Sequence, residues 1–387
     1  MTGHLKRYLP LQTLKILVVA WQIVTQFTSA ANLTYPDVYQ RFLNGLDVFN
    51  FEISWIISAG CVLDLDFHDR LLLSTIGPII ALLFLAATYR AGSRINRGKA
   101  ATLQLVWDRH VSMVLLLVFL VYSSVSSLVF QTFACDQLDG GGEYLRADYR
   151  IECDSSKHQG FRVYAGFMIL LYPVGIPAFY GALLFRDRDV LEKDPDGRED
   201  PPRVASISNL WQPYRPSVYY YEVIECGRRI LLTGLVVFIY PNTAAQIAIT
   251  LIMTVVFAVL SEALHPYAQA WDTWVSRVSH AVVFMSVYVA LLLKVDVSDE
   301  KGSSQKVFEA VLVTAHACMI LAVVVETILL GCPSRVKEQD EPAPRVGDDS
   351  VTMTFSYTNE MKVDCAGNSP AEEDDDDDMN EASLTHV

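Results

Sequence analysis

Four charged side chains stand at the start of an apolar stretch, in the sequence YYYEVIECGRR. They are Glu222, Glu225, Arg228 and Arg229, and the spacing of four between Glu225 and Arg229 favours an ion pair on one face of a helix. Charges next to a membrane-embedded helix are costly, so one interpretation is a gating element or a lipid-headgroup contact. The alternative is an interfacial anchor whose charged ends extend to water.

Four further ionisable side chains fall inside apolar stretches. Glu262 and His280 lie near the facing ends of two adjacent stretches, so we expect them to approach each other. His316 and Glu326 are ten residues apart, an offset of about 80° on a helix, which argues against a shared ligand site. We interpret His316 as a histidine in a helix interface, with a proton or ion site as the alternative.

A helix break is expected in GFMILLYPVGIP, residues 166–177, which lies in the middle of a long apolar run. Pro173 and Pro177 each lack the backbone N–H that an α-helix requires. Gly166 and Gly175 would allow a neighbouring helix to approach closely. The segment is therefore either a kinked packing helix or a hinge at Pro173, Gly175 and Pro177, with a wet pocket beside the freed carbonyl groups.

Two features indicate an extracytoplasmic side of the chain. Cys135 and Cys153 flank a glycine-rich loop, and an oxidising compartment would join them in a disulfide, although two unpaired thiols are the alternative. Asn32 begins a glycosylation sequon, Asn-Leu-Thr, on the same predicted side.

The elements that position these residues are predicted to be membrane-spanning helices. The chain has 387 residues, 52% of them hydrophobic and 19% charged, and a span takes about 20 apolar residues. With the N-terminus inside, the inner loops and span ends before the tail carry 17 Lys and Arg residues against nine outside, which predicts cytoplasmic N- and C-termini. The membrane is either the plasma membrane or an endomembrane. The eight expected spans are Leu11–Ala30, Leu71–Tyr89, Val111–Phe133, Phe161–Phe185, Val223–Tyr240, Ala244–Leu264, Val278–Leu293 and Val307–Gly331.

Residues 332–387 are predicted to form a disordered acidic cytoplasmic tail after a membrane domain of residues 1–331. The tail holds 15 acidic and four basic side chains, which is −11 of the formal net charge of −14. It is either simply solvated or bound by an unknown cytoplasmic partner. The sequence contains no enzyme motif and no basic face for nucleic acid, so we expect neither catalysis, nor a cofactor, nor nucleic-acid binding.

The order of these motifs resembles the membrane region of transient receptor potential (TRP)-like proteins. That group includes polycystin-type and flavin-carrier-type proteins and the C-terminal part of large cysteine-rich protist surface proteins. The similar stretches are LKILVVAWQIV, the loop from FACDQLDGGG to RIEC, YAGFMILLYPVGIPAFYGALL, YYYEVIECGRRILLTGLVVFIYP and LHPYAQAWDTW, spread over residues 14–274.

The resemblance implies an all-α, polytopic membrane bundle that transports inorganic cations, calcium among them, as a homo-oligomer. The sequence departs from the family pattern, because the predicted connection after Tyr240 is too short for a selectivity-filter loop. Two alternatives therefore remain open. One is a secondary transporter, and the other is a membrane receptor or scaffold that signals through the acidic tail.

Overall fold

The computed structural model describes residues 11–33, 35, 37–46, 50, 65–138, 141–193, 202–295 and 303–331. Its contacts divide the chain into two units, Met1–Thr327 and Ile328–Val387, and the first contains nearly all the described residues. The predicted tail, residues 332–387, lies outside the described residues. The elements of the described part are α2 (Leu11–Ala30), α3 (Asp37–Leu46), α5 (Phe67–Ile95), α6 (Ala100–Gln131), β1 (Cys135–Gln137), β2 (Glu143–Leu145), α7 (Ser156–Ile169), η2 (Leu170–Val174), α8 (Gly175–Arg186), α9 (Arg188–Leu191), α10 (Pro202–Ser206), α11 (Ser208–Trp211), η4 (Pro216–Val218), α12 (Tyr221–Thr233), η5 (Leu235–Phe238), α13 (Ala244–Leu264), α14 (Ala270–Lys294) and α15 (Ser303–Gly331).

The described part is largely helical, and five of its helices are long and apolar enough to cross a membrane. These are α5, α6, the continuous segment Ser156–Arg186, α13 and α14. An integral membrane protein is therefore the class that the fold supports. The segments of the other three expected spans are helical but are not among these five: α2 carries polar side chains along its length, α12 with η5 is interrupted, and the apolar part of α15 is Ala310–Val325.

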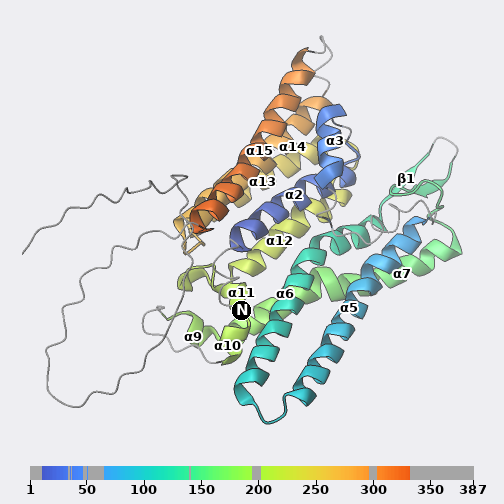
Figure 1. The fold of residues 1–387 in the computed structure, drawn as a ribbon. Helices are drawn as coiled ribbons and strands as arrows, with labels where there is room; N and C mark the ends of the chain where they lie inside the picture. The colour runs from blue at the N-terminus through green and yellow to red at the C-terminus, as the bar shows by residue number, and fades with distance from the viewer. Residues whose placement is uncertain are drawn as a thin grey trace, which may run out of the picture. The chain divides into compact units, whose positions relative to one another are not determined.

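The core of the first unit forms around α2 and α6. Helix α2 packs against α14, α12 and α6, and its apolar side chains are buried on nearly every side. Figure 1 shows α2 and α12 lying side by side, with α13, α14 and α15 grouped next to them. Helix α6 joins this group to α5 and α7. A helix that is buried all round, as α2 is, belongs to the interior of a bundle.

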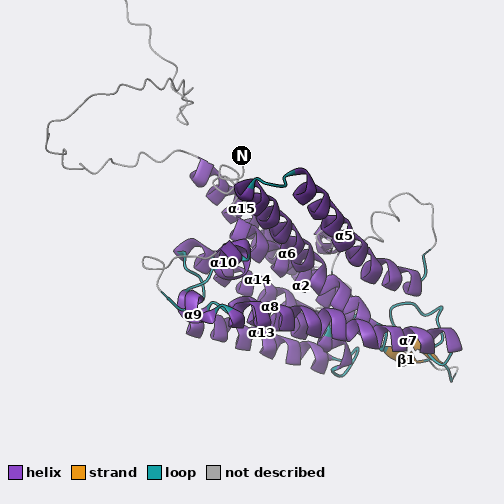
Figure 2. Cartoon of the chain, turned by 90° about the horizontal axis from the view of Figure 1, so that it is seen from below, coloured by secondary structure: helices purple, strands orange, loops and turns teal. Residues whose placement is uncertain are grey.

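The outer helices turn apolar side chains away from this core. In the spanning windows of α5, of Ser156–Arg186 and of α13, 22% of the residues are buried, against 61% in α6. Leu83, Phe84 and Phe167 are each more than 60% exposed, and they come from two of these helices. Exposed apolar surface of this extent is what a hydrocarbon environment covers. Figure 2 shows the helical layer from a second direction.

The break at Pro173 takes the form of a π-helical turn, Leu170–Val174, between α7 and α8. Such turns accommodate a missing backbone hydrogen bond without ending the helix. A Cβ atom on Gly175 would lie 2.8 Å from the carbonyl oxygen of Leu170, so this glycine allows the turn to close on itself. The expected close approach at Gly166 is wrong, because a Cβ atom added there would have no neighbouring atom of the described chain within 4 Å. The interruption therefore depends on Pro173 and Gly175, and Pro177 lies in the first turn of α8.

A second interruption follows α12. The α-helix ends at Thr233, and a 3-10 helix, Leu235–Phe238, continues the segment. A Cβ atom on Gly234 would lie 2.5 Å from Cδ2 of Phe130, so α6 packs directly against the backbone at this joint. The predicted single span Val223–Tyr240 is thus two short helical pieces joined at a glycine.

The loop between α6 and α7 is a compact structure that the disulfide closes. Cys135 and Cys153 are bonded, as the sequence predicts, and β1 pairs with β2 in antiparallel register. Asp148 connects this loop to α5, because its Oδ2 accepts a hydrogen bond from the backbone N–H of Phe67 at 3.3 Å. The same carboxylate accepts from Nε and Nη2 of Arg150, each at 2.9 Å. These hydrogen bonds hold the pKa of Asp148 at about 2.

We expect Gly234→Ala to destabilise the protein by about 1–3 kcal/mol, because the added methyl group overlaps the ring of Phe130. Gly227→Ala is the matched control in the same helix, since nothing lies within 4 Å of that position. Alanine there should be neutral or stabilising by up to about 1 kcal/mol. Thermal unfolding in detergent measures both, and equal midpoints for the two variants would contradict the tight joint.

We expect acid to weaken the attachment of the disulfide-closed loop to α5. The Asp148 pKa is lowered from an unfolded value of about 3.9, so its stabilisation is complete above that pH and is lost as the pH falls towards about 2. The contribution is about 1 kcal/mol after screening by solvent. Thermal unfolding of Asp148→Asn at pH 7 and pH 3 should show a smaller pH dependence than wild type, whereas Asp154→Asn, an exposed residue of the same loop, should not.

Candidate functional site

The charged residues at the start of α12 lie inside the bundle. Glu222, Glu225, Arg228 and Arg229 are all 9% exposed or less. They are surrounded by α2, α6 and α14 and by the segments that carry Tyr214 and Tyr267. The interpretation of these charges as an interfacial anchor in water is therefore wrong. We call this group, with its hydrogen-bond partners, the α12 cluster.

Arg229 is 1% exposed and joins three helices. Its Nη2 atom donates to Oε1 of Gln22 on α2 at 2.6 Å and to the carbonyl oxygen of Phe119 on α6 at 3.0 Å. The guanidinium carbon also lies 4.8 Å from the centre of the Phe119 ring and 5.3 Å from that of Tyr122. Gln22 donates in turn to the carbonyl of Leu120 at 3.0 Å. A buried, planar cation with these partners is a strong positional constraint.

The ion pair of the cluster is Glu225 with Arg228. Nε of Arg228 donates to both carboxylate oxygens of Glu225, at 3.0 and 3.1 Å. The sequence predicts a Glu225–Arg229 pair instead, and this prediction is wrong. The two spacings, three and four, both fit one helix face, and Arg229 points to Gln22, an acceptor on α2 that helix periodicity alone does not reveal.

Glu222 has a different environment. It is 3% exposed, its Oε2 accepts from the hydroxyl of Tyr214 at 2.7 Å, and it makes no ion pair with any described residue. Burial, followed by the charge of Glu222, raises the pKa of Tyr214 well above its usual value, so the phenol stays a donor. A cavity of about 20 Å³ lies beside these groups, lined also by Lys15 and Tyr267. This volume suits one water molecule.

Two other expected contacts are rearranged. Glu262 on α13 pairs with Arg277 on α14, at 2.6 and 2.8 Å, and both side chains are about half exposed. The main contact of Glu262 is therefore Arg277, and not His280 as the sequence predicts. Nδ1 of His280 lies 2.8 Å from the carbonyl oxygen of Ser276, one turn earlier in its own helix.

His316 is fully buried between α15 and α3. Its Nδ1 lies 2.9 Å from the carbonyl oxygen of Leu312, and its ring packs against Tyr39 and Phe42. These contacts agree with a histidine in a helix interface. The side chain of Glu326 lies outside the described residues.

The end of the bundle near the disulfide-closed loop contains a larger cavity, of about 340 Å³. Asn32 lines it, together with Gln40, Asn44, Arg70 and Arg146. Asn32 is exposed and has a left-handed backbone, with φ at 48°. Its sequon includes Thr34, which lies outside the described residues, so glycosylation stays a prediction.

The sequence reasoning missed the partners that α2 contributes. Lys15 donates to the carbonyl of Asn209 at 3.0 Å, and Thr13 donates to Asp272 at 3.0 Å. The available signal was the spacing of seven between Lys15 and Gln22, which puts two polar side chains on one face of an otherwise apolar helix. Tyr214 and Tyr267, which form an isolated antiparallel bridge, had no such signal.

The α12 cluster keeps several charged side chains in a place that solvent hardly reaches. Lys15, Glu222, Glu225 and Arg228 line the small cavity, and Arg229 is buried in the same helix as the last three. The site contains no nucleophile beside a general base among the described residues, but it can hold one polar group of about the size of a water molecule. Compared with known protein families, curated proteins and solved structures, the chain has no match.

We expect Arg229→Ala to destabilise the protein by about 3–5 kcal/mol, because it leaves Gln22 and the Phe119 carbonyl without their buried donor. Arg277→Ala is the control, since its ion pair is exposed and should contribute about 1 kcal/mol or less. Thermal unfolding in the same detergent compares them. If Arg229→Ala unfolds at the same temperature as Arg277→Ala, the hydrogen bonds of Arg229 do not hold α12 against α2 and α6 as described above.

Proposed function

We propose that this chain is a cation-transporting integral membrane protein, a TRP-like channel or a protein derived from one. The observation that carries the proposal is the α12 cluster, a set of buried charges on a short helix inside an apolar bundle. Charged groups are kept at such a depth at a cost, and they commonly mark a pathway or a gate. The resemblance of the sequence to TRP-like proteins supports the same conclusion.

In this proposal the α12 cluster controls opening. Helix α12 lies between Pro216 in η4 and the Gly234 joint, so it is a short rigid piece with a change of helix type at both ends. Arg229 fastens it to α2 and α6. Moving α12 relative to α2 would break these hydrogen bonds together, which gives two discrete arrangements.

The cation path itself is proposed to form between copies of the chain. The interior next to α12 has room for about one water molecule, which does not accommodate a continuous hydrated path. A homo-oligomer supplies such a path at its axis. Counting α2, the α12–η5 segment and α15 with the five long apolar helices gives eight spans, with cytoplasmic N- and C-termini in the plasma membrane or an endomembrane.

A secondary transporter is the second candidate, because the structure contains two interrupted helices. The π-helical turn at Pro173 and the 3-10 segment after Gly234 belong to neighbouring segments, since α8 packs against α12. Transporters commonly form their ion sites at such discontinuous helices. In that case Glu222, without an ion pair among the described residues, is the ion or proton ligand. No described residue bears on the receptor or scaffold alternative, whose acidic tail lies outside the described ranges.

The decisive measurement compares wild type, Glu222→Gln and Glu262→Gln in planar bilayers and in proteoliposomes. For a channel we expect a cation current whose open probability changes several-fold in Glu222→Gln, while the reversal potential stays the same. Glu262→Gln, which alters an exposed carboxylate, should resemble wild type.

Other outcomes separate the alternatives. Flux that needs a counter-ion gradient, shows no current steps and is abolished by Glu222→Gln would replace the channel with the transporter. A folded protein that is silent in both assays would remove cation transport altogether.

A further inference from the structure

The outer ends of α5 and α7 bring two buried histidines next to the disulfide. His158 is fully buried and His68 is 2% exposed, and they come from helices separated by 90 residues of sequence. Neither histidine takes part in the α12 cluster. Buried polar groups are normally hydrogen-bonded, and these two imidazoles bond to each other while one further nitrogen of each ring is without a hydrogen bond among the described residues.

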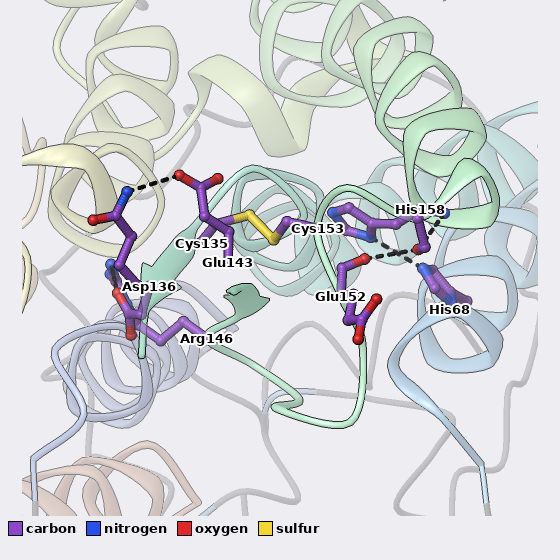
Figure 3. Close-up of a disulfide and its surroundings, with 10 residues drawn as sticks. His68, Cys135, Asp136, Glu143, Arg146, Glu152, Cys153 and His158 are labelled. Carbon is purple, nitrogen blue, oxygen red and sulfur yellow. Dashed lines mark hydrogen bonds and ion pairs between the residues drawn. A yellow bond between two sulfur atoms is a disulfide. The ribbon is translucent and has the colours of Figure 1, made fainter. Parts of the chain in front are cut away.

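His158 lies between the disulfide and His68 (Figure 3). Its Nδ1 atom is 3.1 Å from Nε2 of His68, so these two nitrogens share a proton. Its Nε2 atom is buried and makes no well-formed hydrogen bond among the described residues, and the backbone of Thr132 lies within reach of the ring. One nitrogen of His158 and the sulfur atoms of Cys135 and Cys153 all lie within 4.8 Å of one another.

We propose that Cys135, Cys153 and His158 form a redox-controlled site for a thiophilic divalent cation, of which zinc is the reference. The disulfide closes the site, and reduction opens it. Two thiolates, one imidazole and one open position are a known donor set for tetrahedral zinc. Nε2 of His158 is the ligand atom, because Nδ1 is already occupied by His68.

The surrounding residues supply the support that a metal-bound histidine needs. When His68 accepts the Nδ1 proton of His158, Nε2 of His158 carries the free lone pair that binding a cation requires. Asp66 stands behind His68, with its Oδ2 atom 3.8 Å from Nδ1. This chain of Asp66, His68 and His158 ends at the two sulfur atoms. Nε2 of His158 lies at the sulfur end of this chain, and it is the nitrogen that would bind the cation.

The redox step balances with a dithiol reductant. The dithiol gives two electrons and two protons, its sulfur atoms join in a new disulfide, and the bond between Cys135 and Cys153 breaks to give two thiols. Zinc then displaces the two thiol protons and binds both sulfurs. The ligand atoms around a tetrahedral zinc ion are about 3.3–3.8 Å apart. After reduction the two sulfur atoms therefore move apart. The imidazole nitrogen, which now lies within 4.8 Å of them, moves about 1 Å closer.

The test uses the full chain in detergent, with cobalt(II) as the spectroscopic probe for zinc. The protein is reduced with a dithiol, which is removed without oxygen before cobalt is added. We expect the reduced protein to show a thiolate-to-cobalt charge-transfer band and tetrahedral d–d bands at one cobalt per chain, and zinc to abolish both. The oxidised protein should show neither.

Matched variants assign the band to these residues. Cys135→Ser/Cys153→Ser keeps the other five cysteines and should lose the band. His158→Gln, and His68→Gln by loss of support, should weaken zinc affinity at least 10-fold and about 10–100-fold respectively. His316→Gln, another buried histidine, should bind cobalt as wild type does.

The disulfide form of each histidine variant provides the folding control, by thermal unfolding before reduction. The proposal is overturned if Cys135→Ser/Cys153→Ser retains the cobalt band, or if His158→Gln folds and binds as tightly as wild type. It is equally overturned if reduced wild type keeps its helical circular dichroism and binds no cobalt.

Discussion

The buried guanidinium of Arg229 is the constraint on which the described bundle depends. A guanidinium at 1% exposure needs hydrogen-bond acceptors arranged in advance, and α2 and α6 supply two of them, Oε1 of Gln22 and the carbonyl oxygen of Phe119. Other polar contacts also join these helices, such as the hydrogen bond from Ser123 on α6 to Gln26 on α2, but Arg229 is the side chain that contacts both α2 and α6 from α12. One desolvated cation with fixed partners selects a single register. The Glu225–Arg228 ion pair and the hydrogen bond from Tyr214 to Glu222 belong to the same cluster as this guanidinium.

The fold class could be predicted from the sequence, because hydropathy and length report directly on burial in lipid. The helix break was also predictable, since Pro173 cannot donate a backbone hydrogen bond. Its form as a π-helical turn was not, because that depends on whether Leu170 and Gly175 can approach each other. The disulfide followed from the loop between its two cysteines. Length and hydropathy could not decide whether α2 and α12–η5 are spans, since both carry polar side chains that turn inward.

The candidate site was predictable only in part. The cluster of four charges was visible in the sequence, but its partners come from residues about 100 and 200 positions away. Helix periodicity and charge spacing do not reveal contacts between residues that are so far apart in the sequence. Glu225 pairs with Arg228 because Arg229 donates instead to Gln22, an acceptor on another helix. Glu262 likewise contacts Arg277 because guanidinium and carboxylate meet across adjacent helix ends, a choice between Arg277 and His280 that spacing leaves open.

The carboxylate of Asp148 accepts hydrogen bonds from two parts of the structure, the disulfide-closed loop and the start of α5. It holds Arg150 within the disulfide-closed loop and accepts the first backbone N–H of α5. Lys157, at the start of α7, reaches Asp66 just before α5, at 3.1 Å. The loop, α5 and α7 are therefore connected by side chains at the N-terminal ends of the two helices. A force applied to the loop would act on both of these helix ends together.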